Sequence, residues 1–401
     1  MTGSAIRSNP DSPRRVLLAI RMAGIPGRRK LAGVFRYLEE SQAHWDIRFV
    51  RTREYFTRAF VRTLSRAGID GVIASFPDAH EANAELERSC IPTVMLDPLD
   101  SSLFPKDSRG IAWLQSDSAA IGREAAAHLL AQGRFRSFGF VHDYDRSSWS
   151  EARAAAFSAA VGQCAVFSGK GLSPDRDFAR LIAWIRDLPK PAGVMVAYDD
   201  RAILVMEACR QAGVSVPADV ALVSCDNDEL LCNHLSPGLT SIEADFPRVG
   251  YRAAEILAGM MSARKPPAAT IETCGGVRLV ARGSSAPVSS GGALVVRALA
   301  FIDANADSGI GVEDVVRHLK VSRRLADLRF REVRGMSIAA AIRARRIETV
   351  KDCLARTDDK IEAIAARTGF ANEKHLMTCF RRATGCSMRE WREKSRHDIW
   401  S

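Results

Sequence analysis

The sequence lacks the features of a secreted or membrane-spanning protein. Its longest apolar runs have the length of a β-strand, far short of the roughly 20 residues that cross a bilayer as a helix. The first 13 residues carry charges but no apolar segment of the kind found in secretory signals. Nine cysteines are scattered without a CxxC pair or another pairing pattern. We therefore expect a soluble, cytoplasmic protein with free thiols and no membrane partner, in which residues 1–13 form a disordered tail.

Motifs of the common enzyme classes are also missing. The stretch GIPGRRK (24–30) has neither the Ser/Thr nor the spacing of a phosphate-binding loop. There is no GxSxG or HExxH motif, and the eight histidines are dispersed without metal-ligand spacing. The sequence thus predicts no enzyme, no metal and no cofactor, although a sugar-processing enzyme fused to a second domain is the less favoured alternative.

The first two thirds of the chain alternate between short apolar runs and amphipathic helical stretches. Such runs, rich in β-branched residues and without polar alternation, indicate parallel strands that helices cover on both faces. They are too numerous for one sheet, so we predict an α/β domain of two lobes over 14–284 with a ligand cleft between them. Lobe one should span about 14–134 and 244–270, and lobe two about 135–243 and 271–284. The predicted strands include 16–20, 47–50, 71–75, 93–96, 137–141, 164–167, 193–198 and 220–226.

The composition changes abruptly near residue 284. RGSSAPVSSGG (282–292) is rich in Gly and Ser, so we expect a flexible linker over 285–292. The strand pattern is absent after it, and 293–397 is predicted to be all helical. The net charge of the whole chain is +10. From Ala293 onward there are 22 Lys/Arg and 15 Asp/Glu, against 35 and 32 in the rest, so the positive excess lies in this last domain.

This helical domain contains one arrangement twice. A short helix, a turn and a basic helix that ends at Gly occur around VSRRLADLRFREVRGMS (321–337) and GFANEKHLMTCFRRATGCSMREWR (369–392). Two helix-turn-helix units joined by a helix of about 20 residues, roughly 30 Å long, could enter successive major grooves of duplex DNA. The alternative is a helical domain that binds another protein. The DNA hypothesis gives two groups of candidate residues. Base edges are assigned to Arg323, Arg324, Asp327, Glu373, Lys374 and Thr378, and phosphates to Asn372, Arg381 and Arg382.

These two stretches resemble the paired helix-turn-helix units of AraC-type transcription regulators. The resemblance depends most on Gly369-Phe370, Phe380-Arg381-Arg382, Gly385 and Trp391-Arg392. In the first unit, Leu328 stands where the family commonly has an Arg that reads a base. The resemblance implies sequence-specific binding to an operator in double-stranded DNA.

The front domain resembles the effector domain of the lac repressor family, which is itself similar to periplasmic sugar-binding proteins. The matching stretches are WLQSDSAAIGREAAAHLLAQGRFRSFGFV (113–141), VPADVALVSCDNDELL (216–231) and LSPGLTSIEADFPRVGYRAAEILAGM (235–260). The resemblance makes Arg153, Asp199 and Asp226 candidate partners of sugar hydroxyls, since carboxylates accept and a guanidinium donates hydrogen bonds. Arg28 is a candidate from the other lobe, and Trp149 is either a platform for a sugar ring or a packed aromatic. Each Asp could instead be a helix N-cap, and Asp200 competes with Asp199 for the ligand.

A lac-repressor-like sensor followed by an AraC-type domain is the layout of bacterial xylose operon regulators. The resemblance implies a sugar-responsive regulator, an activator of carbohydrate-utilisation genes with xylose or a related monosaccharide as effector. It also implies a homodimer that works with RNA polymerase. The alternative is a regulator whose sensor responds to a protein partner or to a metabolite that is not a sugar.

Overall fold

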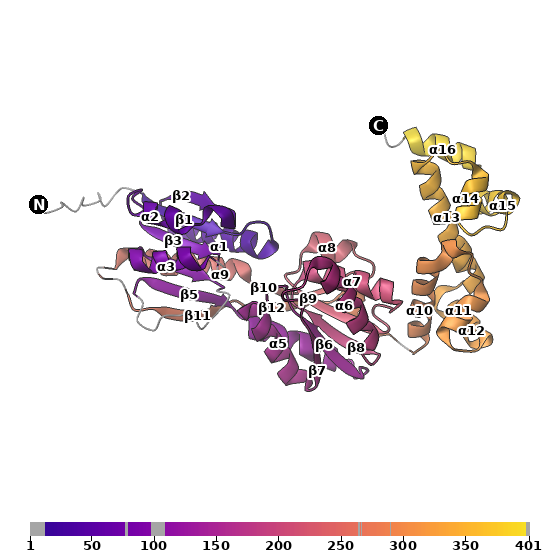
Figure 1. The fold of residues 1–401 in the computed structure, drawn as a ribbon, viewed down its shortest axis with the longest axis horizontal. Helices are drawn as coiled ribbons and strands as arrows, with labels where there is room; N and C mark the ends of the chain where they lie inside the picture. Colours follow the sequence, from indigo (N-terminus) through magenta and orange to yellow (C-terminus); the bar gives the residue numbers. More distant parts are fainter. Residues whose placement is uncertain are drawn as a thin grey trace, which may run out of the picture.

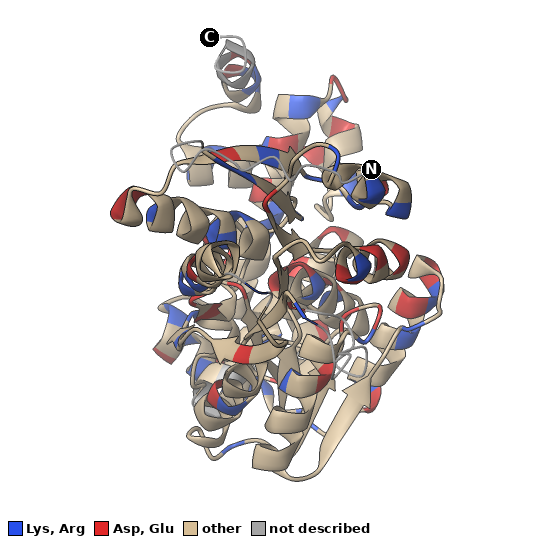
Figure 2. Ribbon diagram, turned by 90° about the vertical axis from the view of Figure 1, so that its left-hand side faces the viewer, with Lys and Arg blue, Asp and Glu red and all other residues tan. Residues whose placement is uncertain are grey.

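The structure, a computed structural model, contains two α/β lobes followed by a helical domain (Figure 1). It describes residues 13–76, 79–97, 109–263, 265, 267–288 and 290–397. Twelve residues of the expected N-terminal tail therefore lie outside the described part. In the described ranges, no helix combines the length and the apolar character that a bilayer requires. Figure 2 shows basic and acidic residues intermingled along the helices of the molecule.

The first lobe is built on a parallel six-stranded sheet with the order β11-β5-β4-β3-β1-β2. Its strands are β1 (Arg14–Ile20), β2 (Trp45–Val50), β3 (Gly71–Ser75), β4 (Thr93–Leu96), β5 (Ile111–Ser116) and β11 (Thr270–Cys274). Successive residues of β1 enter different cores, because side chains alternate across a strand. Val16 and Leu18 pack with α1 (Ile25–Ser41) and α9 (Phe246–Ser262), and Leu17 packs with α2 (Arg58–Leu64) and α3 (His80–Ser89).

The second lobe repeats this three-layer design. Its sheet has the order β12-β10-β9-β8-β6-β7, in which only the β10–β12 pair is antiparallel. The strands are β6 (Ser137–Val141), β7 (Cys164–Phe167), β8 (Ala192–Val196), β9 (Val220–Cys225), β10 (Thr240–Ala244) and β12 (Val277–Val280). The helices are α4 (Ser118–Leu130), α5 (Ser148–Val161), α6 (Pro174–Asp187), α7 (Asp199–Ala212) and α8 (Glu229–His234). The predicted two-lobed α/β architecture is confirmed.

The boundary between the lobes differs from the predicted one in two places. Helix α4 falls in the predicted lobe one, yet its Ile121, Ala125 and Leu129 share a core with Phe140 of β6, so it belongs to lobe two. Strand β11 pairs with β5 and therefore extends lobe one to Cys274 instead of residue 270. The physical reason in both cases is that the chain crosses between lobes at strand ends, which composition does not reveal.

The Gly/Ser-rich stretch begins as part of lobe two and not as a loose spacer. Ser284 and Ser285 lie in a short 3-10 helix, η3 (Gly283–Ser285), and both are fully buried. The Ser284 hydroxyl accepts a hydrogen bond from the Thr240 amide at 2.8 Å and donates one to the Leu222 carbonyl at 2.8 Å. Helix α10 already begins at Ser290, so the described residues that lie between η3 and α10 are 286–288. The predicted linker over 285–292 is therefore too long.

The C-terminal domain has two hydrophobic cores that one helix joins. Its helices are α10 (Ser290–Asn305), α11 (Val312–Leu319), α12 (Arg323–Arg334), α13 (Ile338–Arg356), α14 (Ile361–Arg367), α15 (Glu373–Thr384) and α16 (Met388–His397). Ile338 and Ile342 of α13 pack with α11 and α12, whereas Val350 and Leu354 pack with α14 and α15. Two helix-turn-helix units therefore share α13, as predicted.

Candidate ligand cavity and DNA interface

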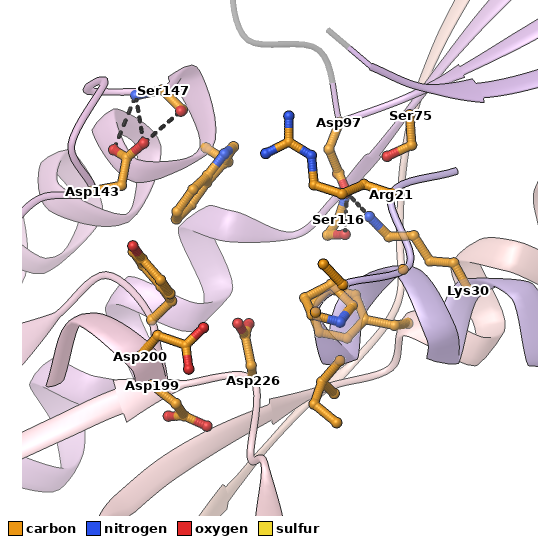
Figure 3. Close-up of a pocket in the computed structure, with 18 of the residues that line it drawn as sticks. Arg21, Lys30, Ser75, Asp97, Ser116, Asp143, Ser147, Asp199, Asp200 and Asp226 are labelled. Carbon is orange, nitrogen blue, oxygen red and sulfur yellow. Dashed lines mark hydrogen bonds and ion pairs between the residues drawn. The ribbon is translucent and has the colours of Figure 1, made fainter. Parts of the chain in front are cut away.

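A cavity of about 580 Å³ lies between the two lobes. The loops and helix starts that follow the carboxyl ends of strands in both sheets line it, as is usual for ligand sites of open α/β sheets. Figure 3 shows side chains from both lobes directed into it. All five predicted ligand residues are among the lining residues, namely Arg28, Trp149, Arg153, Asp199 and Asp226. Their contact with a ligand remains a prediction, and their surroundings differ.

Arg153 forms one wall of the cavity together with an aromatic ring. Its guanidinium carbon lies 4.6 Å from the centre of the Trp149 ring, and one guanidinium nitrogen donates to the carbonyl of Ala197. The ring of Tyr198 meets Trp149 edge to face at 6.1 Å. Helix α4 packs closely against α5 at this wall. A Cβ at Gly122 of α4 would lie only 2.4 Å from the Arg153 carbonyl oxygen, so no larger residue fits there. The Arg153 Nε has no hydrogen-bond partner although it is buried.

Asp226 follows β9 and directs its carboxyl group into the cavity (Figure 3). Its φ of 108° lies in the region that favours glycine, and its amide is held by the carbonyl of Ile242 at 2.9 Å. Burial raises the pKa of Asp226 to about 7, an effect that the positive charge of Arg153 partly offsets. A strained, partly desolvated carboxyl group beside a guanidinium is well suited to accept hydrogen bonds from hydroxyl groups.

Asp199 has its carboxylate occupied within lobe two. It accepts hydrogen bonds from the hydroxyls of Ser224 and Ser241, from the backbone amide of Asp228 and from the thiol of Cys232. It is 2% exposed, and burial raises its pKa. Asp200, the first-turn neighbour of Asp199 in α7, is exposed and lines the cavity. The geometry therefore favours Asp200 over Asp199 as the carboxylate that meets a ligand.

Lobe one contributes a charged pair that the sequence did not indicate. The Lys30 ammonium of α1 contacts the Asp97 carboxylate, which also accepts the amide of Ser116 at 2.7 Å. Burial alone would raise the pKa of Asp97, but the charge and hydrogen bond of Lys30 hold it below its usual range. Sixty-seven residues separate Lys30 from Asp97, so only the position of Asp97 at the end of β4 could have indicated the site.

Arg28 lies at the rim of the cavity and is exposed. One of its guanidinium nitrogens donates to the carbonyls of Met22 and Ala23, at 3.2 and 3.1 Å. The side chain thereby shapes the loop between β1 and α1.

The loop after β6 supplies a second wall that the sequence did not indicate. Arg201 and Asp177 form a buried, bidentate ion pair, in which the two terminal guanidinium nitrogens lie 2.6 and 2.8 Å from the two carboxylate oxygens. The Arg201 guanidinium carbon lies 4.3 Å from the centre of the Tyr144 ring, which lines the cavity. The pair thus holds Tyr144 beside the ligand space.

The predicted DNA-contacting residues lie on the surface of the helical domain, at the N-terminal ends and along the outer faces of α12 and α15. All are exposed except Asp327, which is half-buried. Ser322 caps α12 by accepting the amide of Leu325, and Asn372 caps α15 by accepting the amide of His375 at 2.8 Å. Arg323 contacts the carboxylates of Glu313 and Asp327, so its charge is partly compensated within the first unit.

The two helix-turn-helix units are fixed to one another. Arg346 of α13 donates to the carbonyls of Ala306 and Ile310, both at 2.8 Å. Gly369, with φ 73°, lies against the same turn, and a Cβ there would be 2.9 Å from the Ala306 oxygen. The relative position of α12 and α15 is therefore set by packed backbone.

Known protein families match both the α/β domain and the helical domain of the chain. Residues 126–285 match the periplasmic binding protein-like domain, and residues 315–394 match a helix-turn-helix domain. The xylose operon regulatory protein of Haemophilus influenzae is 25% identical over 389 residues, 94% of this chain and 98% of that protein. Its counterpart in Escherichia coli K12 is 27% identical over 91% of this chain and 93% of that protein.

Solved structures show the same architecture. The structure of a xylose-binding transcription activator aligns with a TM-score of 0.64 at 24% identity, over 96% of this chain and 98% of that chain. A lac repressor dimer bound to operator aligns over 69% of this chain and 95% of that one, with a TM-score of 0.53 at 20% identity. The chain thus carries a periplasmic-binding-protein-like sensor domain followed by an AraC-type helix-turn-helix domain, and it is similar to the xylose operon regulatory proteins over nearly its whole length.

Proposed function

We propose that this protein is a sugar-responsive transcription regulator, in which a monosaccharide in the interlobe cavity controls how α12 and α15 bind duplex DNA. The observation that carries the proposal is one chain that joins two helix-turn-helix units to a cavity lined by carboxylates, guanidinium groups and aromatic rings. Xylose or a related monosaccharide is the proposed effector, because the relatives similar over more than nine tenths of the chain are xylose operon regulatory proteins.

The cavity chemistry supports a polyhydroxylated ligand. Asp226 and Asp200 can accept hydrogen bonds from ring hydroxyls, and Arg153 can donate to them. Trp149 and Tyr144 offer apolar faces for the C–H side of a sugar ring. A volume of about 580 Å³ is within the range of small-molecule sites and leaves room for bound water beside a monosaccharide.

The proposed mechanism is a change in the equilibrium between lobe arrangements. The cavity residues come from both lobes, so a ligand that contacts both favours the arrangement in which they lie close. Lobe two carries η3, and α10 follows within a few residues, so its movement reaches the DNA-binding domain through a short connection. Family likeness supports action in the cytoplasm as an activator, as a homodimer and together with RNA polymerase.

Two measurements on the purified full-length protein test the proposal. Thermal melting with pentoses, hexoses and sugar acids identifies the effector, and xylose should raise the melting temperature. Selection from a random duplex pool, with and without that sugar, then gives the operator and the sign of the response. If no sugar shifts the melting temperature while DNA selection succeeds, the sensor responds to a protein or to another metabolite. Turnover of the sugar would instead indicate an enzyme.

A further inference from the structure

The exposed large apolar side chains of the helical domain are concentrated on and next to α12. Within the described part of the domain, three lie on α12, one lies two residues after its end and one lies on α15: Leu325, Leu328, Val333, Met336 and Met377. Single exposed apolar residues are common on protein surfaces. At 100° per residue, Val333 lies on the same side of α12 as its buried residues, whereas Leu325 and Leu328 point away from that side. This pair indicates that the outer face of α12 meets an apolar group as well as charged ones.

Leu328 occupies the centre of the outer face of α12. Ala326 and Phe330 are fully buried and define the inner face of this helix. At 100° per residue, Leu328 points almost directly away from the mean direction of those two side chains, and Arg324 lies one turn earlier on the same outer face. Leu328 is 50% exposed there. A side chain in this position faces the major groove when the second helix of a helix-turn-helix unit enters it.

The surroundings of Leu328 match nucleic acid and not an apolar protein partner. Helix α12 carries five arginines against one Asp and one Glu, a balance that suits the phosphates on both sides of a groove. The major groove exposes one apolar group, the C5-methyl of thymine, which aliphatic side chains contact in direct readout. Leu328 cannot form the hydrogen bonds that an Arg makes to guanine.

We propose that Leu328 is a specificity-determining residue of the first helix-turn-helix unit and selects thymine by contact with its C5-methyl group. The inference rests on the proposed DNA binding and names the base class that this unit reads. Leu325, 39% exposed at the start of the same helix, extends the apolar contact toward the neighbouring base step.

A methyl-deletion experiment tests the inference. The full-length protein first selects its preferred duplex from a random pool, and each thymine of that duplex is then replaced singly by deoxyuridine, which removes only the methyl group. At one thymine of the half-site bound by the first unit, the wild type should bind about fourfold more weakly to the deoxyuridine duplex, the loss expected for one buried methyl-sized group. Leu328→Ala should bind the thymine and deoxyuridine duplexes equally at that position, so that the two changes are not additive.

Two further variants sharpen the result. Met377→Ala, a matched truncation of an exposed side chain in the second unit, should retain the fourfold discrimination at the first half-site. Leu328→Arg should select guanine in place of thymine at the same position. Discrimination that persists in Leu328→Ala, or a first half-site without thymine, overturns the inference and leaves the proposed function intact. Failure of the wild type to select any sequence overturns the proposed DNA binding itself.

Discussion

Asp199 and Asp200 are adjacent in the sequence, but their carboxylates lie in opposite surroundings. Four groups within lobe two donate to the buried carboxylate of Asp199, which thereby holds the start of α7 to β9, β10 and α8. Asp200 is exposed and lines the cavity. The start of α7 thus supplies Asp199, which stabilises lobe two, and Asp200, which can contact a ligand.

This difference predicts opposite effects of two neighbouring substitutions. Asp199→Ala leaves buried donors unpaired and should lower the free energy of unfolding by about 2–4 kcal/mol. Asp200→Ala should change it by no more than about 1 kcal/mol, the upper value for an exposed charge in the first helical turn. Asp200→Ala should nevertheless weaken sugar binding at least tenfold, as measured by titration calorimetry. Wild-type sugar affinity in Asp200→Ala would remove this residue from the site.

The carboxyl group of Asp226 predicts a pH dependence of stability. Its pKa is about 7 in the folded chain, against roughly 3.9 when unfolded. Between these values the folded state binds a proton that the unfolded state has released, so the free energy of unfolding falls as pH rises from about 4 to about 7. Asp226→Asn should remove this contribution and be the more stable protein at pH 8, by at most roughly 4 kcal/mol. The two proteins should converge near pH 4.

Chemical denaturation followed by tryptophan fluorescence measures this difference in the absence of sugar. The difference between wild type and variant cancels the titration of groups that do not interact with Asp226, whereas Asp199, whose charge also raises the pKa of Asp226, contributes to the difference. A constant difference across this pH range would mean that burial does not perturb the carboxyl group.

The buried start of the linker predicts where the sensor can be cut. A chain of residues 1–288 keeps the hydrogen bonds of Ser284 and those of Arg282 to the carbonyl of Leu239 and the side chain of Asn227. It should melt at the temperature of the sensor in the full protein, bind sugar and show no specific DNA binding. A chain that ends at residue 281 lacks these contacts and should melt several degrees lower. Equal melting of the two fragments would show that η3 contributes nothing.

Two glycines with positive φ predict how firmly the helix-turn-helix units are joined. Gly335→Ala, in open space, should cost only the backbone strain of about 1–2 kcal/mol. Gly369→Ala has similar strain but also brings a Cβ to 2.9 Å from the Ala306 oxygen, so its cost should be larger. It should also weaken binding to a duplex that spans both half-sites, as measured by fluorescence anisotropy. Equal effects of the two substitutions would show that the units are not coupled at this turn.

The architecture could be predicted from the sequence because the patterns that indicate the strands and the helix-turn-helix units lie within short segments of the chain. Short apolar runs between helices indicated two covered sheets, and helix, turn and terminal Gly indicated each DNA-binding unit. Contacts between distant segments were not readable. Nothing local shows that α4 leaves lobe one, that Lys30 meets Asp97, or that Ser285 is buried. The choice between Asp199 and Asp200 likewise depends on donors at Ser224 and Ser241, which are far away in the chain.

In the proposed function, occupancy of the cavity by a sugar is transmitted to the DNA-binding helices. The most direct test is the affinity of the full-length protein for its selected duplex, measured by anisotropy with and without saturating xylose, for the wild type and for Asp226→Ala. Xylose should change the wild-type Kd by roughly 5- to 150-fold, the usual range of coupling between two sites. Asp226→Ala should bind the duplex with the sugar-free wild-type Kd and show no response to xylose. A Kd of the wild type that no monosaccharide changes, or a variant that loses DNA binding together with the sugar response, would contradict the account.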